Sequence, residues 1–219
     1  MNQFPIAQDG FLYIIIGLVL SVVLFLINPW VSLAGLLPTL FIIFFFRNPR
    51  RTGPELADSI ISPADGRIMS VTPVDRTDYY DGPAVKITIF LSLFNVHINR
   101  APVSGRVYCH HYRPGQYLPA FKSHASDINE RNTIGLVCND RKILVHQITG
   151  FVARRVVCDV DTGDMLLQRQ RFGMIRFGSC TEVICPSDTL VLVQPGDRVK
   201  GGLSVIAQFS AGSEVAHVS

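Results

Sequence analysis

The first 46 residues contain no lysine or arginine and only one acidic residue, Asp9. All 20 Lys and Arg residues of the 219-residue chain occur from Arg47 onward. Charged residues make up only 17% of the sequence, below the roughly 25% of typical soluble domains. The formal net charge is +3, and no basic cluster with interleaved aromatic residues occurs, so nucleic acid is not an expected partner. The mild positive charge fits an anionic membrane surface instead.

Patterns that bind metals or form disulfides are also lacking. The five cysteines are odd in number, widely spaced and form no CxxC pair. A disulfide framework and a cysteine-based zinc site are therefore not expected, and a reducing compartment fits best. Neither HExxH nor His-x-His spacing occurs, which argues against a membrane-anchored zinc peptidase. We expect no metal site.

Two hydrophobic runs fill the uncharged N-terminal part. They cover residues 11–27 and 30–46 and are separated by Asn28 and Pro29. Each run would form a helix of about 26 Å, near the lower limit for crossing a hydrocarbon core of about 30 Å. Asn-Pro is a turn signal, and proline disfavours helical geometry in the residue before it. The sequence therefore predicts a membrane-associated helical hairpin over residues 1–46.

Arg47, Arg50 and Arg51 directly follow the second run. The positive-inside rule then predicts that the rest of the chain lies at the cytoplasmic face of the cell membrane. A signal peptide is disfavoured because no basic residue precedes the first run and no small-residue cleavage site follows it. A re-entrant hairpin and a hairpin buried in a soluble fold stay open at this point.

The residue pattern changes from residue 59 onward, where short Val- and Ile-rich runs alternate with Gly, Pro and Asp. Period-two alternation and frequent spacings of about 8–12 residues favour a mostly β domain of the antiparallel sandwich or barrel type. The expected strands are 67–74, 84–91, 105–110, 142–149, 154–160, 181–185, 189–193 and 204–209. Residues 47–58 read as a linker to this β-rich domain, which covers 59–219. The segment 193–206 resembles the hairpin that closes lipoyl and biotinyl hammerhead folds, so hammerhead-like hairpins are expected.

Three segments carry residues suited to chemistry. RFGSCTE, residues 176–182, places Gly178 before Ser179 between two apolar runs. A serine hydroxyl can attack the preceding carbonyl, and glycine leaves that carbonyl unobstructed and tolerates strained backbone geometry. The ester formed by this N-to-O acyl shift can undergo β-elimination, which leaves dehydroalanine and then a pyruvoyl group at residue 179. Taken alone, however, Gly-Ser is usually an ordinary bend.

The other two segments offer an acid and a base. His97 follows an apolar strand in LSLFNVHINRAP, residues 91–102, where a histidine can exchange protons at neutral pH. Asp65 lies in the turn ISPADGR, residues 61–67, and could orient His97 as the acid does in a Ser-His-Asp set. A turn aspartate and a structural histidine are the ordinary alternatives, because spacing alone does not establish contact.

Four segments together resemble the phosphatidylserine decarboxylase proenzymes, particularly their short bacterial and archaeal form. They are SPADGRI (62–68), FNVHINRAPVSG (94–105), RFGS (176–179) and VQPGDRVKGG (193–202). The resemblance runs in order across about residues 47–210. It implies cleavage between Gly178 and Ser179, a heterodimer of a large chain (1–178) and a small chain (179–219), and a covalent pyruvoyl cofactor derived from Ser179.

The resemblance also implies an activity. Phosphatidylserine would be decarboxylated to phosphatidylethanolamine through a Schiff base with the pyruvoyl group, with Asp65 and His97 activating Ser179 during maturation. Long-form members have a second histidine three residues after the first and commonly a threonine after the cleavage-site serine, where this chain has Arg100 and Cys180. His97 is therefore a candidate for both maturation and turnover. Candidate phosphate ligands are Arg100, Arg113 and Arg176.

An alternative from another class is a membrane-anchored hammerhead-type binding module without catalysis. It would account for the hydrophobic hairpin and the β texture, and it would remain a single chain. The sequence leaves open whether the lipid is based on diacylglycerol or archaeol, and it is compatible with a higher oligomer.

Overall fold

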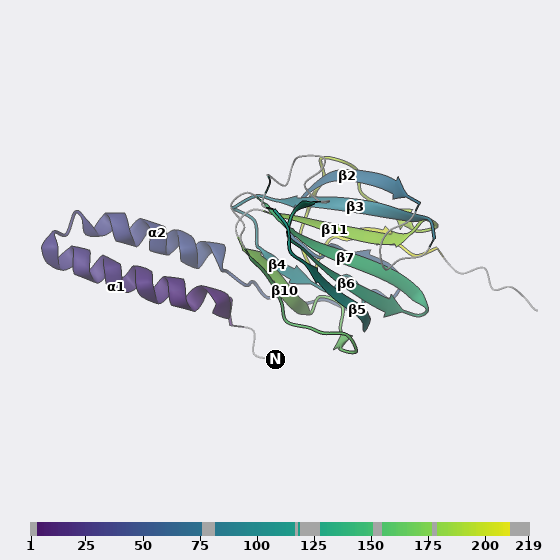
Figure 1. Cartoon of the computed structure of the whole chain (residues 1–219), viewed down its shortest axis with the longest axis horizontal. Helices are drawn as coiled ribbons and strands as arrows, with labels where there is room; N and C mark the ends of the chain where they lie inside the picture. Colours follow the sequence, from purple (N-terminus) through teal and green to yellow (C-terminus); the bar gives the residue numbers. More distant parts are fainter. Residues whose placement is uncertain are drawn as a thin grey trace, which may run out of the picture.

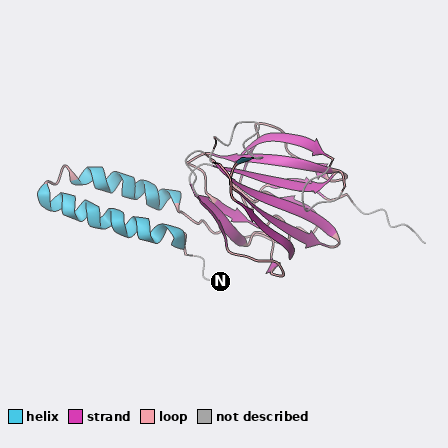
Figure 2. Ribbon diagram, viewed as in Figure 1, coloured by secondary structure: helices cyan, strands magenta, loops and turns pink. Residues whose placement is uncertain are grey.

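The computed structural model describes residues 4–75, 82–116, 118, 128–150, 155–176 and 179–210. A pair of antiparallel helices projects from one side of a body built of strands (Figure 1). Colouring by secondary structure separates the two parts clearly, with the long helices in the hairpin and the strands in the body (Figure 2). The predicted class, a mostly β domain preceded by a helical hairpin, is confirmed.

The hairpin consists of α1 (Phe11–Ile27) and α2 (Ser32–Phe45), preceded by the short 3-10 helix η1 (Gln8–Gly10). Helix α1 has the bounds of the first hydrophobic run, whereas α2 begins two residues later than the second run. The delay arises in the turn, where the Asn28 side-chain oxygen accepts a hydrogen bond from the Trp30 amide at 2.8 Å. Such local bonding by asparagine competes with helix formation, as expected for a turn residue.

Small residues line the contact between the two helices. A side chain at Gly17 would collide with Thr39, and one at Gly35 would collide with Ser21. The Ser21 and Thr39 hydroxyls donate to the carbonyls of Gly17 and Gly35 at 2.7 and 2.8 Å, so the polar atoms are satisfied inside the hairpin. Large apolar side chains cover the outside, and Leu26, for example, is 79% exposed. Residues 8–27 are long and apolar enough to cross a membrane, and α2 is a shorter apolar helix.

The body is dominated by an eight-stranded antiparallel sheet that curls into a half-barrel. In sheet order, its strands are β13 (Arg198–Val199), β2 (Gly66–Val74), β3 (Ala84–Leu91), β11 (Ser179–Pro186), β7 (Arg141–Thr149), β6 (Arg131–Cys138), β5 (Gly105–Arg113) and β9 (Met165–Leu166). Two three-stranded sheets complete the body: β1 (Ser59–Ile61), β14 (Val205–Gln208) and β12 (Leu190–Val191), and β4 (Ile98–Arg100), β10 (Arg171–Arg176) and β8 (Arg155–Cys158).

All eight expected strands are present, but β6 and several short strands were not predicted. Strand β6 begins Arg-Asn-Thr and contains Gly135, so its sequence interrupts the alternation that marks a strand. The main core joins the three sheets, since Ile89 of β3 and Ile134 of β6 cluster with Phe172 of β10 and Ile206 of β14. The body is therefore layered, as a sandwich-like fold requires.

The base of the hairpin packs directly on the body. Ala7, Phe45 and Phe46 are buried in a second cluster that includes Ile98 of β4 and Met174 of β10. The two ends of the hairpin also bond to each other, with the Ala7 amide donating to the Phe46 carbonyl at 2.8 Å. The segment predicted as a linker, 47–58, holds no helix or strand beyond one isolated bridge at its first residue.

An ion-pair cluster also fastens the hairpin to β10. Asp9 pairs with Arg171 at 2.8 Å and with Arg176 at 2.9 Å. Residues five apart on a regular strand face opposite sides, but β10 has a register shift between Arg171 and Gly173. A bulge of this kind changes the alternation and allows both arginines to reach one carboxylate. The acidic residue of the hairpin thus fixes the strand that precedes the predicted cleavage site.

Candidate active site

Ser179 is the first residue of β11, which occupies an interior position in the large sheet. Its backbone pairs with Leu91 of β3 on one side and with Thr149 of β7 on the other. Gly178, on the other side of the predicted cleavage bond, lies outside the described residues. The structure therefore places the start of the predicted small chain but not the bond itself.

Two chain connections bring His97 to the end of the sheet where Ser179 begins. Leu91, the strand partner of Ser179, precedes His97 by six residues. The His97 carbonyl accepts a hydrogen bond from the amide of Ile175, four residues before Ser179, at 3.1 Å. The predicted serine and histidine segments are thus neighbours in the fold.

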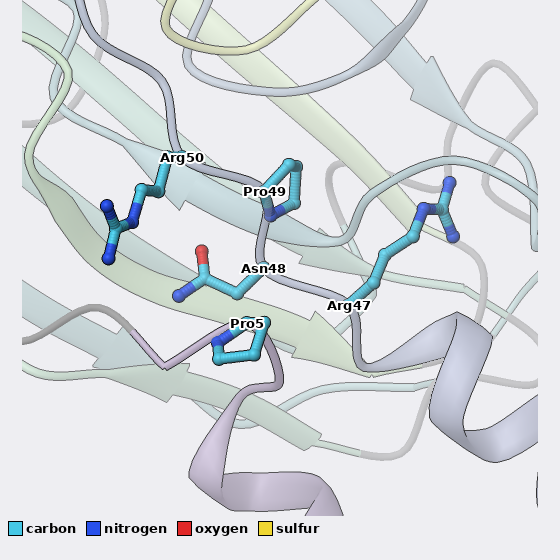
Figure 3. Close-up of a pocket in the computed structure, with 5 residues that line it drawn as sticks. All are labelled: Pro5, Arg47, Asn48, Pro49 and Arg50. Atoms are coloured by element: carbon cyan, nitrogen blue, oxygen red, sulfur yellow. The ribbon is translucent and has the colours of Figure 1, made fainter.

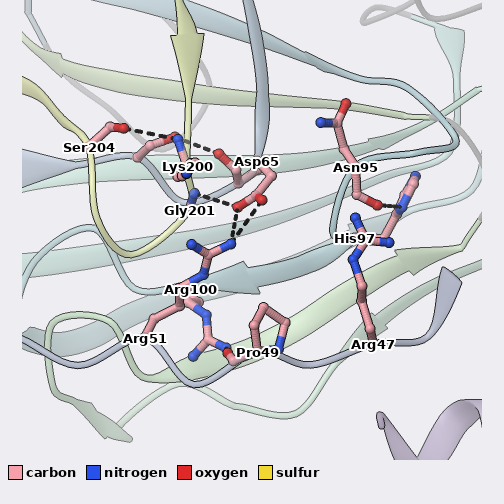
Figure 4. A network of polar contacts seen from close by, with 12 residues as sticks. Arg47, Pro49, Arg51, Asp65, Asn95, His97, Arg100, Lys200, Gly201 and Ser204 are labelled. Carbon is pink, nitrogen blue, oxygen red and sulfur yellow. Dashed lines mark hydrogen bonds and ion pairs between the residues drawn. The ribbon is translucent and has the colours of Figure 1, made fainter. Parts of the chain in front are cut away.

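The imidazole of His97 is fully buried beneath the hairpin base. Its ring centroid lies 4.3 Å from that of Phe45, and its Nδ1 lies 3.0 Å from the Asn95 carbonyl oxygen (Figure 4). Burial lowers the pKa of His97 to about 4, the Asn95 hydrogen bond opposes that change, and the Arg47 cation adds to it. The ring is therefore neutral at pH 7, and Nδ1–H donation to Asn95 leaves the lone pair on Nε2, which suits a base.

Asp65 lies where two predicted motifs meet. Its carboxylate pairs with Arg51 at 3.0 Å and accepts a hydrogen bond from the Gly201 amide, in the PGDRVKGG segment, at 2.7 Å (Figure 4). Burial raises the pKa of Asp65, while the Arg51 cation opposes that increase. Asp65 and His97 are both described by the structure, and no hydrogen bond or ion pair joins them.

Strand β4 accounts for this separation. Arg100, at its far end, donates its amide to the Pro63 carbonyl at 2.9 Å, beside the Asp65 turn. Three residues of extended chain, about 10 Å, separate Arg100 from His97. The structure thus places the segments of His97 and Ser179 in neighbouring parts of the fold and Asp65 beside the opposite end of β4.

Two of the three candidate phosphate ligands are already engaged. Arg100 is only 1% exposed, and its guanidinium donates to the carbonyls of Arg169 and Pro49 and to the side chain of Asn48 at 2.9 to 3.1 Å. Burial lowers the pKa of Arg100 to about 10. Arg176 is held by Asp9, as described above. Arg113, the third, lies at the end of β5 and pairs in register with Arg131 of β6.

The structure also reveals functional candidates that sequence reasoning missed. Arg47 lies beside His97 and Arg51 holds Asp65 (Figure 4). From the sequence, both arginines were interpreted only as a signal of membrane topology and of attraction to anionic headgroups. A pocket of about 400 Å³ opens next to them, lined by Pro5, Arg47, Asn48, Pro49 and Arg50 (Figure 3). The guanidinium groups of Arg47 and Arg50 point in opposite directions there. The one sequence signal that could have identified these arginines as functional candidates was their position directly after a hydrophobic run.

A buried chain of amides runs beneath the start of β11. Asn99 donates to the Thr181 hydroxyl at 3.1 Å, Gln147 donates to Asn99 at 2.9 Å, and Asn132 donates to Gln147 at 2.9 Å. All four side chains are buried, so these bonds satisfy polar groups that would otherwise be costly. Residues from four strands contribute, and no sequence spacing predicts such a chain.

Comparison with known proteins finds one family over most of the chain. Residues 39–207 match the family model described as phosphatidylserine decarboxylase. A phosphatidylserine decarboxylase proenzyme of Carboxydothermus hydrogenoformans is 55% identical over 203 residues, covering 92% of this chain and 95% of the relative. Relatives of the same name from Symbiobacterium thermophilum and Syntrophus aciditrophicus are 45% and 44% identical and cover 95% and 93% of this chain and 98% and 97% of their own lengths. These matches confirm the resemblance drawn from the four motifs: the chain belongs to the phosphatidylserine decarboxylase family.

Proposed function

We propose that this chain is a precursor that cleaves itself between Gly178 and Ser179 and then converts phosphatidylserine to phosphatidylethanolamine with a pyruvoyl group derived from Ser179. The observation that carries the proposal is the buried, neutral His97 at the end of the sheet where β11 begins with Ser179. The name proenzyme, borne by the relatives, supports a precursor that must mature.

In the proposed maturation, Nε2 of His97 accepts the Ser179 hydroxyl proton as the oxygen attacks the Gly178 carbonyl carbon. The amide nitrogen of residue 179 leaves that carbon and takes up the proton, which forms an ester. His97 then removes the α-proton of residue 179, and the Gly178 carboxylate departs. Water releases ammonia and leaves the carbonyl at the start of the small chain. A positioned base typically contributes roughly 10²–10⁴ in rate.

Asp65 enters the proposal as a positioning residue. Its carboxylate joins Arg51 to the Gly201 amide, and thereby holds the 62–65 turn against the 200–202 segment. That turn also accepts the amide of Arg100 at the end of β4. We therefore assign Asp65 to fixing the strand that carries His97, acting through β4 rather than through a bond to the imidazole.

In turnover, a pyruvoyl carbonyl supplies an electron sink for decarboxylation of an amino acid headgroup. The residues present fit this group, because the backbone of Ser179 pairs with Leu91, six residues before His97, and the strand before Ser179 bonds to the His97 carbonyl. The Phe45 ring packs on the buried imidazole and helps to exclude water from it, which strengthens polar interactions there. Nε2 of His97 would take up the proton that the substrate ammonium loses, and would return a proton to the product α-carbon after carbon dioxide has left.

The large chain (1–178) and small chain (179–219) would stay together as a heterodimer, because β11 pairs with β3 and β7 of the large chain. The hairpin would insert into the anionic cell membrane, with Arg47, Arg50 and Arg51 on the cytoplasmic face. This placement suits the proposed substrate, whose acyl chains leave a bilayer at a cost of about 0.8 kcal/mol per CH₂.

Intact mass measurement of the purified, denatured protein tests the proposed cleavage. We expect two chains, ending at residue 178 and beginning at residue 179, with the smaller resistant to Edman degradation. Only the smaller chain should react with hydrazine or borohydride, because it alone carries the carbonyl. A single chain of full mass without a reactive carbonyl would contradict the proposal and favour a binding module without catalysis.

The membrane location predicts the effect of polar substitutions on the outside of the hairpin. Changing Val19, Leu26 and Leu37 together to Gln should move the protein from sedimented membranes to the soluble fraction. Each substitution removes roughly 1.5–3 kcal/mol of favourable free energy from burying an apolar side chain in lipid. The partition coefficient of the protein between membrane and water should therefore fall at least a thousandfold. Leu167→Gln is the matched control, because this side chain is 67% exposed on the β body. Unchanged sedimentation of the triple variant would mean that the body binds lipid without the hairpin.

A further inference from the structure

Arg47 sits where the hairpin meets the body, with its guanidinium beside His97 (Figure 4). Nη1 donates to the Phe44 carbonyl at 2.8 Å and Nη2 donates to the Phe94 carbonyl at 2.7 Å. The guanidinium carbon also lies 3.9 Å from the centroid of the Phe44 ring. Two carbonyls and a ring therefore fix the orientation of this cation without neutralising its charge.

The charges around the site do not balance. Three arginines, Arg47, Arg51 and Arg100, surround one carboxylate, Asp65, which is already paired with Arg51. Across the described ranges of the chain, no carboxylate pairs with Arg47 or Arg100. A partly buried cation without a counter-charge is costly, so an anion that binds there would be stabilised.

Arg47 is the cation that remains available for a ligand near His97. Arg100 is almost completely buried among carbonyl and amide oxygens, and Arg176 is occupied by Asp9. Arg47 keeps partial exposure, and an arginine has five N–H donors, of which only two are used here. Its guanidinium can therefore donate further hydrogen bonds to an oxygen ligand.

We propose that Arg47 binds the phosphodiester group of the phosphatidylserine headgroup while the headgroup amine reaches residue 179. This inference rests on the proposed function. Arg47 directly follows α2, so it lies at the level where lipid phosphates meet the hairpin, and its planar donors match phosphate oxygens. The phosphate persists through the reaction. The substrate carboxylate does not, and a cation that bound it tightly would stabilise the ground state more than the transition state.

Kinetics of the matured Arg47→Ala variant test the proposal. With phosphatidylserine in mixed micelles, we expect KM to rise about tenfold to a hundredfold, as for loss of a hydrogen bond to a charged group, and kcat to change much less. With O-dodecanoyl-serine, which has the amine and carboxylate but no phosphate, the variant should match the parent. Arg47→Lys should recover part of the loss, because it keeps the charge without the planar donors.

Arg50→Ala is the matched control. Arg50 belongs to the same segment, is exposed, and points away from Arg47 (Figure 3). We expect parental KM values for this variant. Equal effects of the two alanine variants would mean general surface attraction, and equal effects on both substrates would assign Arg47 to the carboxylate; either result would overturn the proposal.

The outcomes also separate this inference from the proposed function. An uncleaved, inactive parent would defeat the proposed function itself, whereas an active parent with an unchanged KM in Arg47→Ala would defeat only the role of Arg47. If Arg47→Ala does not mature, Arg47→Lys decides: a several-fold higher KM for the phosphate-containing substrate alone supports the role, and an unchanged KM overturns it.

Discussion

Ser179→Ala is expected to leave one uncleaved chain of 219 residues with no decarboxylase activity. The methyl group has no oxygen to attack the Gly178 carbonyl, so neither the ester nor the carbonyl at residue 179 can form. Denaturing electrophoresis with intact mass measures cleavage, and release of carbon dioxide from carboxyl-labelled phosphatidylserine measures activity. The loss should be complete rather than partial, because the same residue supplies both the cleavage and the reactive group.

A control serine exists at the other end of the same strand. Ser187 directly follows β11 and is exposed, so Ser187→Ala should be cleaved and active like the parent. Normal cleavage of the Ser179→Ala chain would place the reactive bond elsewhere and remove the basis of the proposed function.

His97→Ala is expected to slow maturation by roughly 10²–10⁴, because the base that accepts the serine proton is lost. The fraction of cleaved chain after synthesis, followed over time, measures this effect. His111→Ala is the control, since His111 lies exposed on β5. Maturation of His97→Ala at the parental rate would remove the assigned base.

The environment of His97 also predicts how maturation depends on pH. With its pKa near 4, the imidazole remains neutral well below pH 6, so the cleavage rate should stay level from pH 7.5 to about pH 5. The rate should then fall about tenfold per pH unit below pH 4, as the base becomes protonated. A midpoint near 6.5, the usual histidine value, would contradict this assignment.

The lowered pKa of His97 also affects the stability of the folded state. The folded state binds the His97 proton more weakly than the unfolded state, so this group contributes fully to stability above about pH 6.5. Its contribution decreases as the pH falls from about 6.5 toward 4, where the unfolded chain gains a proton and the folded chain does not. As the pH is lowered, the fold should therefore begin to lose stability at a higher pH than the one at which cleavage becomes inhibited.

Local sequence signals predicted most of the architecture. The run 11–27 became α1 with the same bounds, because apolar length and the Asn-Pro turn are properties of neighbouring residues. Strand β3 likewise matched the expected 84–91 run. Strand β6 was missed because its polar start and Gly135 hide the alternation, and tertiary pairing with β5 and β7 determines its conformation.

The members of the candidate site were named from the sequence and stay predictions, whereas their contacts could not be predicted. Motif order named Asp65, His97 and Ser179, yet the acid lies with Arg51 and Gly201 instead of beside the imidazole. The link between Asp9 and Arg171 spans more than 160 positions, and only the folded chain brings them together. Arg47 illustrates the same limit, because a basic residue after a hydrophobic run predicts orientation in a membrane and not a neighbour of His97.

The interior position of β11 has a consequence for the lifetime of each molecule. If cleavage occurs at its first residue, the fragment carrying the reactive carbonyl is held by neighbouring strands on both sides. Swapping that fragment with one from another copy would require the sheet to come apart in the middle. Each protein would then keep the carbonyl it generated once, and chemical damage to it could be replaced only by synthesis of a new polypeptide.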